Sequence, residues 1–235
     1  MKNIIFVGPD PQKINESSNP GGQLTAAIGL VHYFSAKGID ITIVNTLQSS
    51  FPTPSFATRL ALGLKRVSKL VLLLKTKNYS GVILFSGAGF SFYERTVLCG
   101  LCRVFSVRSI LMIRDGNFKK MLSNSHVKTF IIRFFLKFPD YIVVQGKTWK
   151  DLLVSHKIPI NKIRIIRNWL SFDQEVSNTS IKKTHSSRIT FTFIGWMIKE
   201  KGLHELIGAI KKLQAQGYSF YINIIGGGNL LEKLI

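Results

Sequence analysis

The residues best suited to chemistry stand in the segment FIGWMIKEKGLHELIGAI, residues 193–210. An apolar run ends there at Gly195, and a helical pattern begins after Gly202, with Lys201 directly before it. Glycine allows backbone N–H groups to approach a bound group, and the first turn of a helix carries partial positive charge. The segment therefore predicts a phosphate site that includes Lys201, and an ordinary solvated lysine is the alternative.

Two further glycine-rich turns separate an apolar run from a helical pattern. Gly21 and Gly22 precede the helical pattern that begins at Gln23, and Gly226 and Gly228 follow the run at 219–225. Each turn fits a phosphate-binding loop, but a left-handed turn without a ligand explains either one equally simply.

The other motifs that could hold a metal or a nucleotide fail on inspection. Cys99 and Cys102 form a single C-x-x-C without a second pair, which favours two small core residues on one helix. Gly146-Lys147-Thr148 lacks the first glycine of a phosphate-binding loop, and the five histidines are scattered. The sequence predicts no metal site and no cofactor other than a nucleotide-type substrate.

The apolar periodicity predicts an α/β fold with a parallel sheet. Short runs rich in β-formers alternate with stretches of helical spacing, such as Gln23–Lys37, which ends at Gly38. Right-handed crossovers join such strands, and ligands bind at the carboxyl ends of the strands. The six expected strands are Asn3–Val7, Ile39–Asn45, Gly81–Phe85, Ser109–Ile113, Asp140–Gln145 and Lys162–Arg167.

A polar stretch divides the chain. Residues 1–175 are expected to form a Rossmann-like domain, 176–187 a linker, and 188–235 the beginning of a second domain. That second part holds only the expected strand Arg188–Gly195, the helix Leu203–Ala215 and the strand Ser219–Ile225. A helix cap is expected at Asn229 and Glu232. We expect this incomplete domain to be poorly ordered or prone to associate, and the 235-residue chain by itself to be inactive.

The charge is strongly basic, with 32 Lys+Arg against 12 Asp+Glu and a net charge of +20. Such a field attracts lipid headgroups, nucleotides or nucleic acid, but no nucleic-acid-binding module is recognisable. The stretch Thr58–Lys77 predicts a helix with Leu60, Leu64, Val67, Val71 and Leu74 on its apolar face. Its basic side favours a membrane surface, although a helix packed on the sheet would show the same pattern. The basic residues assigned to that surface are Arg59, Lys65, Arg66 and Lys69.

In combination these motifs resemble glycosyltransferase family four, the retaining nucleotide-sugar enzymes of GT-B fold. The double glycine after the first strand, the FIGWMIKEKG turn and the IIGGG turn after the next strand occur in the order of that family. The segment KIRIIRNWLSF places Asn168 at the family's asparagine. The likeness extends over essentially all of the chain.

The resemblance implies a donor site. Gly22, with its neighbour Gly21, would approach the phosphates of the nucleotide sugar, and Lys201 would pair with its diphosphate. Gly226 and Gly228 would border the nucleoside. Gly195 and Trp196 belong to the same site, although Trp196 replaces the arginine that is usual in the family. The family's glutamate pair, which holds the donor's sugar and ribose, is expected beyond Ile235.

A second departure from the family follows the expected strand Ser109–Ile113. The familiar histidine is replaced there by Arg114-Asp115-Gly116-Asn117. Asp115 is the candidate catalytic residue or polar contact, and a charged turn without a catalytic role is the alternative. The neighbours assigned to sugar or acceptor contacts are Arg114, Asn117, Lys119 and Lys120.

The sequence thus predicts a hexosyl-type, retaining glycosyltransferase that moves a sugar to a lipid-linked or glycan acceptor in cell-surface polysaccharide synthesis. Its opening residues lack the apolar stretch of a signal peptide, so it is expected in the cytoplasm, peripheral at the inner face of the plasma membrane. The rival hypothesis is a truncated, non-catalytic, basic fragment that binds the membrane surface.

Overall fold

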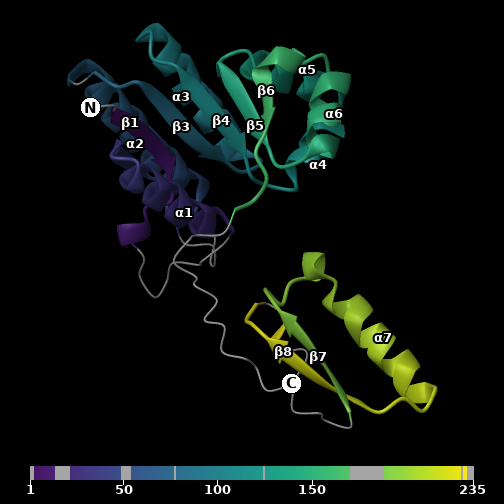
Figure 1. Cartoon of the computed structure of the whole chain (residues 1–235). Coiled ribbons are helices and arrows are strands. Elements are labelled where there is room, and N and C mark those ends of the chain that lie inside the picture. The colour runs from purple at the N-terminus through teal and green to yellow at the C-terminus, as the bar shows by residue number, and fades with distance from the viewer. Residues whose placement is uncertain are drawn as a thin grey trace. The chain divides into compact units, whose positions relative to one another are not determined.

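The computed structural model describes residues 3–13, 22–48, 54–76, 78–123, 125–169, 188–228 and 230–231. The chain divides into two compact units, Met1–Glu175 and Val176–Ile235, and each is described by itself (Figure 1). Gly21 and the predicted cap residues Asn229 and Glu232 lie outside the described residues.

The first unit is built on a six-stranded parallel sheet in the order β2-β1-β3-β4-β5-β6. All six expected runs are strands, with ends that shift by at most two residues, so the α/β prediction is confirmed. The strands are β1 (Asn3–Gly8), β2 (Asp40–Asn45), β3 (Gly81–Ser86), β4 (Ser109–Ile113), β5 (Tyr141–Val144) and β6 (Ile163–Ile165).

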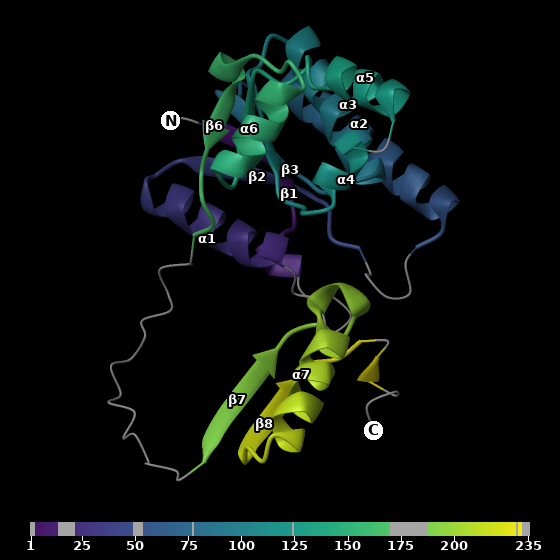
Figure 2. The ribbon, with the colours of Figure 1, turned by 90° about the vertical axis from the view of Figure 1, so that its right-hand side faces the viewer.

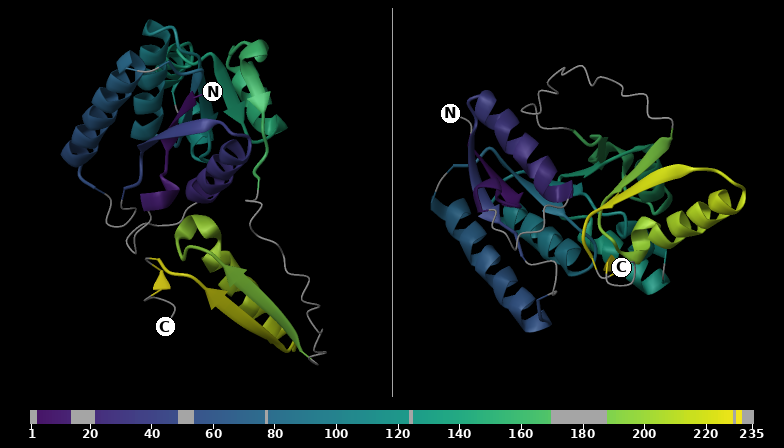
Figure 3. Two further views of the ribbon diagram at one scale, coloured as in Figure 1. Left: turned by 60° about the vertical axis from the view of Figure 1, so that its left-hand side comes forward. Right: turned by 90° about the horizontal axis from the view of Figure 1, so that it is seen from below.

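The strand order decides which helices cover which face. The chain steps from β1 to β2 in one direction and afterwards runs from β3 to β6 in the other, so right-handed crossovers place the connections on opposite faces. One face carries α1 (Gly22–Ala36). The other carries α2 (Phe56–Thr76), α3 (Phe90–Val104), α5 (His126–Phe135) and α6 (Lys147–Ser155), while α4 (Phe118–Ser123) precedes α5 (Figures 2 and 3). Two short 3-10 turns, η1 (Pro11–Lys13) and η2 (Ile160–Lys162), complete the described part of this unit.

Alternation along the strands creates two cores. Ile5 and Val7 belong to the larger core, which also includes residues of α2, α3 and α5. Phe6 points to the opposite side and packs with Ala26 and Ala27 of α1. All five side chains are buried, as the two-residue period of a strand covered on both faces requires.

An arginine lies at the core-facing side of α2. Arg66 is only 6% exposed, and its Nε and Nη2 donate to the two carboxylate oxygens of Glu94 on α3. Arg95 contacts the same carboxylate at 2.6 Å. The assignment of Arg66 to a membrane surface is therefore wrong, because a buried guanidinium needs a bidentate partner and Glu94 supplies it.

This pair also corrects the predicted apolar face of α2. Of the predicted face, Leu74 is buried and Val67 and Val71 are half-buried, but Leu60 and Leu64 are exposed, and Gly63, Arg66 and Leu70 are buried in their place. The buried side is thus rotated from the predicted one. Hydrophobic spacing alone misplaced it because the ion pair makes a charged residue part of the interior.

The two cysteines are core residues of α3, as expected. Both thiols are buried, and burial raises the pKa of Cys99 well above its usual range and that of Cys102 to about 12. They therefore remain protonated and unreactive at neutral pH.

The second unit contains two parallel strands and one long helix among its described residues. β7 (Ile189–Ile194) pairs with β8 (Phe220–Ile225), and α7 (Leu203–Ala215) follows the 3-10 turn η3 (Lys199–Lys201). A small core of Met197, Leu203 and Leu230 joins α7 to one face of the strands. Ile194, Tyr221 and Ile225 on the opposite face are exposed.

Two glycines after β8 permit a close approach between backbone segments. Gly226 has φ 152° and Gly228 has φ 149°, both in the region that favours glycine. A Cβ on Gly226 would lie 1.9 Å from the carbonyl oxygen of Gly195, and one on Gly228 would lie 2.6 Å from that of Met197. The turn after β8 is thereby tied to the turn after β7, with a Met197 N–H to Gly227 O hydrogen bond of 2.8 Å.

Gly226→Ala should loosen the second unit, since the new methyl group would overlap the carbonyl of Gly195. We expect the free energy of local opening to fall by roughly 2–4 kcal/mol, the scale of a strained backbone with a steric clash. Amide hydrogen exchange measured on peptides from 188–228 would detect this, with the peptides of the first unit as internal reference. Gly227→Ala is the matched control, because a Cβ added there would meet nothing within 4 Å. Wild-type protection in Gly226→Ala would contradict this role of the glycine.

Candidate functional site

A polar cavity of about 450 Å³ lies at the carboxyl edge of the first unit's sheet. Its walls come from the residues that follow β1, β2, β4, β5 and β6 and from the first turn of α1. Within the described residues, no aspartate or glutamate lines it. The lining residues are Pro9, Gly22, Gln23, Leu24, Thr46, Leu47, Gln48, Arg114, Gln145 and Asn168.

Gly22 lies at the start of α1 and is exposed to the cavity, and its contact with donor phosphates stays a prediction. The first turn of an α-helix leaves N–H groups without intrahelical partners, and its dipole favours an anion. Gln23 follows Gly22 and adds a side-chain amide to the same wall. Gly21, assigned to the same role, lies outside the described residues.

Arg114 lies at the cavity and contacts two aromatic rings that are themselves in contact, with their centres 6.5 Å apart. Its guanidinium carbon lies 5.0 Å from the centre of the Phe85 ring and 4.6 Å from that of Trp169. Its Nη2 donates to Asn168 Oδ1 at 2.9 Å. Trp169 is fixed in turn, because its Nε1 donates to the Ala26 carbonyl of α1 at 3.1 Å. Residues from the ends of β3 and β6 and from α1 thus set the orientation of a single guanidinium.

Asp115 uses its carboxylate to join two loops. Oδ2 accepts from the Ala88 backbone N–H and Oδ1 from that of Asn117, both at 2.9 Å. Asp115 does not line the polar cavity. Its catalytic role stays a prediction, and the observed bonds show a carboxylate that fixes the loops after β3 and β4.

The remaining residues of this predicted cluster point elsewhere. Asn117 and Lys120 line a separate cavity of about 440 Å³ together with Lys128 of α5, and Lys119 is exposed beside them. The structure therefore separates Arg114 from the other proposed acceptor contacts. Sequence proximity suggested one group, but the turn after β4 sends its side chains to different sides.

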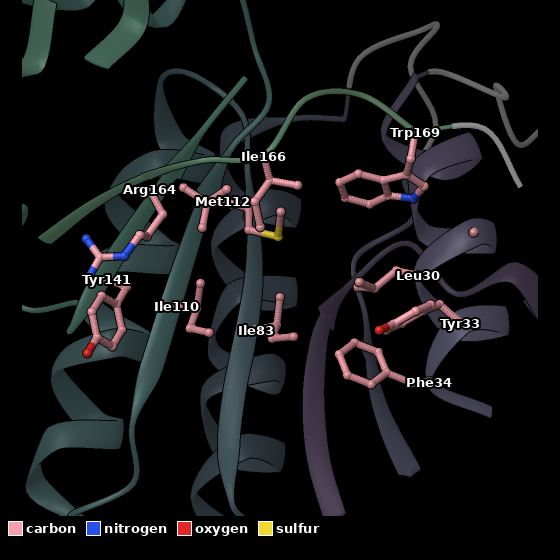
Figure 4. Close-up of a pocket in the computed structure, with 12 residues that line it drawn as sticks. Leu30, Tyr33, Phe34, Ile83, Ile110, Met112, Tyr141, Arg164, Ile166 and Trp169 are labelled. Carbon is pink, nitrogen blue, oxygen red and sulfur yellow. The ribbon is translucent and has the colours of Figure 1, made fainter. Parts of the chain in front are cut away.

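An apolar groove of about 580 Å³ lies on the face of the sheet that carries α1 (Figure 4). Leu30, Tyr33 and Phe34 of α1 form one side, and Ile83, Ile110 and Met112 form its floor. Arg164 lies over the Tyr141 ring at the far side, and Trp169 closes the groove next to α1. The groove exists because only one helix among the described residues covers this face.

In the second unit the predicted donor residues gather around two turns. Gly202 has φ 74° and opens α7, and Lys201 directly before it is exposed. Gly202 supplies no side-chain cap to α7, and the carboxylate of Glu205 lies in the first turn, with Oε2 3.7 Å from where a Cβ on Gly202 would be. Trp196 is half-buried, and the core position beside it is taken by Met197.

Sequence reasoning missed two amide side chains of the polar cavity, Gln23 and Gln145, and it missed Trp169, which lines the apolar groove and contacts Arg114. Gln145 directly follows β5, so a search restricted to polar residues after each strand would have found it. Trp169 gave no such signal, because its importance comes from its contacts with Arg114 and Ala26. The described residues contain neither a cluster of three metal-ligating side chains nor a helix long and apolar enough to cross a membrane.

Comparisons with known proteins bear on this geometry. No family model matches the chain. An uncharacterized glycosyltransferase of Methanocaldococcus jannaschii is 28% identical over 138 residues, which cover 55% of this chain and 34% of the relative. The chain therefore spans about a third of the length of this curated relative.

Solved structures share the fold at low identity. Anabaena HepE in complex with UDP and glucose has a TM-score of 0.56 and 11% identity, covering 97% of this chain and 70% of its own. Starch synthase IV of Arabidopsis thaliana, bound to ADP and acarbose, has a TM-score of 0.60 and 11% identity, covering 95% and 68%. A UDP-N-acetylglucosamine 2-epimerase of Rickettsia bellii also matches, with a TM-score of 0.55 and 13% identity, covering 99% and 63%. The likeness establishes a fold of the GT-B type, which more than one reaction class uses.

Proposed function

We propose that the protein is a glycosyltransferase that takes its sugar from a nucleoside-diphosphate sugar. The observation that carries this proposal is the pair of turns in the second unit. The Gly226–Gly228 turn lies against Gly195 and Met197, and Met197 shares a core with Leu203, the first residue of α7 after Lys201 and Gly202. The likeness to a curated glycosyltransferase and to structures bound to UDP and ADP supports it. Membership of family four and a retaining mechanism are the finer parts of the proposal.

The chemistry that such an enzyme requires suits these turns. Sugar transfer separates a diphosphate from the sugar carbon, so negative charge develops on the leaving group. A lysine and helix N–H groups aimed at that charge stabilise it more in the transition state than in the substrate. Lys201 and the start of α7 would do this in the second unit.

The proposed acceptor is lipid-linked and held at the cytoplasmic face of the plasma membrane, in cell-surface polysaccharide synthesis. Support comes from α5, where Val127, Phe130, Ile131 and Phe134 are all exposed. Their i, i+3, i+4, i+7 spacing places them on one side of the helix, with Lys128 and Arg133 as basic neighbours.

Helix α2 supports the same proposal in a corrected form. Leu64 and Leu72 are exposed on it together with Lys65. Lys69 donates to the Ile43 carbonyl at 2.9 Å, and Arg59 lies 5.2 Å from the centre of the Phe90 ring. The exposed side of α2 thus combines leucines with lysines, as a surface helix at an anionic bilayer would. A non-catalytic membrane-binding fragment remains the rival function, since it would use the same surface.

Lys201→Ala should weaken UDP binding by about 1.5–3 kcal/mol, because a charge-assisted hydrogen bond to phosphate is lost. Titration calorimetry with UDP and with ADP would measure the change. Lys199→Ala is the matched control, since Lys199 is an exposed lysine of the same 3-10 turn. Equal losses in both variants would point to general electrostatics, and no loss in Lys201→Ala would refute the assigned contact.

Binding to anionic vesicles should depend on the α5 stripe. The double variant Phe130→Ser with Phe134→Ser removes two exposed rings, each of which stabilises the bound state by up to about 1.5–3 kcal/mol when fully buried. We expect at least tenfold weaker co-sedimentation with phosphatidylglycerol vesicles, and weaker wild-type binding as salt rises. Ile160→Ser, at an exposed apolar residue of η2, is the control. Equal, negligible wild-type binding to anionic and neutral vesicles would remove the membrane from the proposed function.

A further inference from the structure

The cavity of about 440 Å³ that Lys120 lines is built from residues of α3, α4 and α5 and from the loops before α3 and α4. Its polar lining includes Lys120 of α4 and Lys128 of α5, and its apolar lining includes Met121 and Ile132. No carboxylate is among the described residues that line it. An anion in this cavity would therefore be attracted by two ammonium groups at once.

The carboxylates next to the cavity in the sequence are already engaged. Asp115 accepts from two backbone N–H groups. Glu94 accepts from Arg66 and contacts Arg95. The segment 116–139, which includes α4 and α5, contains five lysines and arginines and no aspartate or glutamate. The positive charge around the cavity thus has no counter-charge within this segment.

Contacts between the helices hold the walls of the cavity in place. Thr129 Oγ1 donates to the Leu122 carbonyl at 2.7 Å, which links α5 to α4. The Gly89 backbone N–H donates to Met121 Sδ at 3.0 Å, which links the start of α3 to α4. Both contacts exist without a ligand, so the cavity is preformed. Binding to a preformed site avoids part of the entropy cost of ordering the protein.

The exposed apolar stripe of α5 borders this cavity. The stripe consists of Val127, Phe130, Ile131 and Phe134. Lys128 lies three positions before Ile131, so the two side chains are neighbours on the helix surface. A helix in a membrane interface buries such a stripe at the boundary between headgroups and acyl chains. A lysine at the edge of the stripe is then at the depth of the lipid phosphates.

The stripe and the lysines together select the class of ligand. A nucleic acid or a free nucleotide offers phosphates to the lysines, but it leaves four large apolar side chains in water. An anionic bilayer satisfies both features, because acyl chains cover the stripe and headgroup phosphates reach the ammonium groups. The observations therefore favour a phospholipid over the other phosphate-bearing ligands.

We propose that this cavity binds the headgroup of one anionic bilayer phospholipid while the α5 stripe enters the same leaflet. Lys120 and Lys128 pair with the lipid phosphate, and the Asn117 amide donates to a headgroup oxygen. The proposal rests on the membrane part of the proposed function. It goes further by assigning a site for a single lipid molecule, beyond general attraction to a charged surface.

The position of the cavity connects this lipid with the sheet. Ala88 and Asn117 line the cavity and follow β3 and β4, so the cavity lies at the carboxyl edge of the first unit's sheet. The polar cavity with Gly22 lies at the same edge. A lipid bound beside α5 therefore brings the bilayer to the edge at which ligands of parallel sheets bind.

The test uses a soluble lipid to separate the cavity from the bilayer. Dihexanoyl phosphatidylglycerol below its micelle concentration is titrated into the 235-residue chain and followed by calorimetry and by ³¹P NMR. We expect saturable binding that is roughly tenfold tighter than that of dihexanoyl phosphatidylcholine, whose headgroup has no net charge. Equal binding of the two lipids would overturn the headgroup assignment.

The double variant Lys120→Gln with Lys128→Gln should weaken binding of the soluble phosphatidylglycerol by roughly tenfold or more. Lys119→Gln with Lys137→Gln is the matched control, because it removes two exposed lysines of the same segment that do not line the cavity. The control should stay within about threefold of the wild type. Equal losses in both double variants would show general electrostatics in place of a site, and unchanged affinity in the first variant would also refute it.

The stripe is tested separately with Phe130→Ser and Phe134→Ser combined. This variant should lose binding to phosphatidylglycerol vesicles but keep binding of the soluble lipid, since neither ring lines the cavity. The variant of Lys120 and Lys128 should lose both. If the serine variant also lost the soluble lipid, the lipid would occupy the stripe and the cavity assignment would be wrong.

Thermal unfolding and a conservative variant separate binding from folding. Lys120 and Lys128 are exposed, so their replacement by glutamine should leave the melting temperature unchanged. Lys120→Arg with Lys128→Arg keeps both charges and should retain most of the affinity for the soluble lipid. An arginine variant that binds no better than the glutamine variant would contradict pairing of these charges with the phosphate.

Failure of this site can be distinguished from failure of the proposed function. Salt-sensitive vesicle binding that does not depend on Lys120 and Lys128 would overturn the lipid site and leave the membrane location standing. UDP binding that depends on Lys201, without binding of any lipid, would overturn both the site and the membrane location. Nucleotide-sugar transfer would then stand alone.

Discussion

The handedness of the strand crossovers is the constraint on which the rest of the first unit depends. Because every parallel connection turns right-handed, the step from β1 to β2 puts α1 on one face, and the later connections put their helices on the other. At the carboxyl edge, the reversal opens a space beside the start of α1. The polar cavity with Gly22, Arg114 and Asn168 occupies this edge.

The same constraint accounts for the apolar groove. One helix is too narrow to cover six strands, so the floor formed by Ile83, Ile110 and Met112 is left open beside α1. Trp169 connects the groove with the polar cavity, since it lines the former and stacks on Arg114 of the latter. The apolar groove and the polar cavity are therefore neighbours, and the indole of Trp169 lies at their boundary.

The basic side chains differ in what stabilises their positive charge: a carboxylate, aromatic rings with an amide, or water. Arg66 enters the interior only because Glu94 of α3 neutralises it with two hydrogen bonds. Arg114 contacts two aromatic rings and donates to the Asn168 amide, and its buried Nε and Nη1 have no partner among the described residues. Lys65 and Lys128 remain exposed on α2 and α5, where water solvates them and their field extends outward.

The sequence by itself determined the α/β fold, the six strands of the first unit and the glycine turns of the second. These features depend on short-range periodicity and on the backbone freedom of glycine, as Gly202 and Gly226 show. Only the tertiary structure decided that Arg66 is interior, that Arg114 and Asn117 face different cavities, and that Trp169 belongs to the site. Each of these outcomes depends on a partner distant in the chain, such as Glu94 for Arg66 or Ala26 for Trp169. Such pairings follow from how strands and helices pack, and residue spacing carries no information about them.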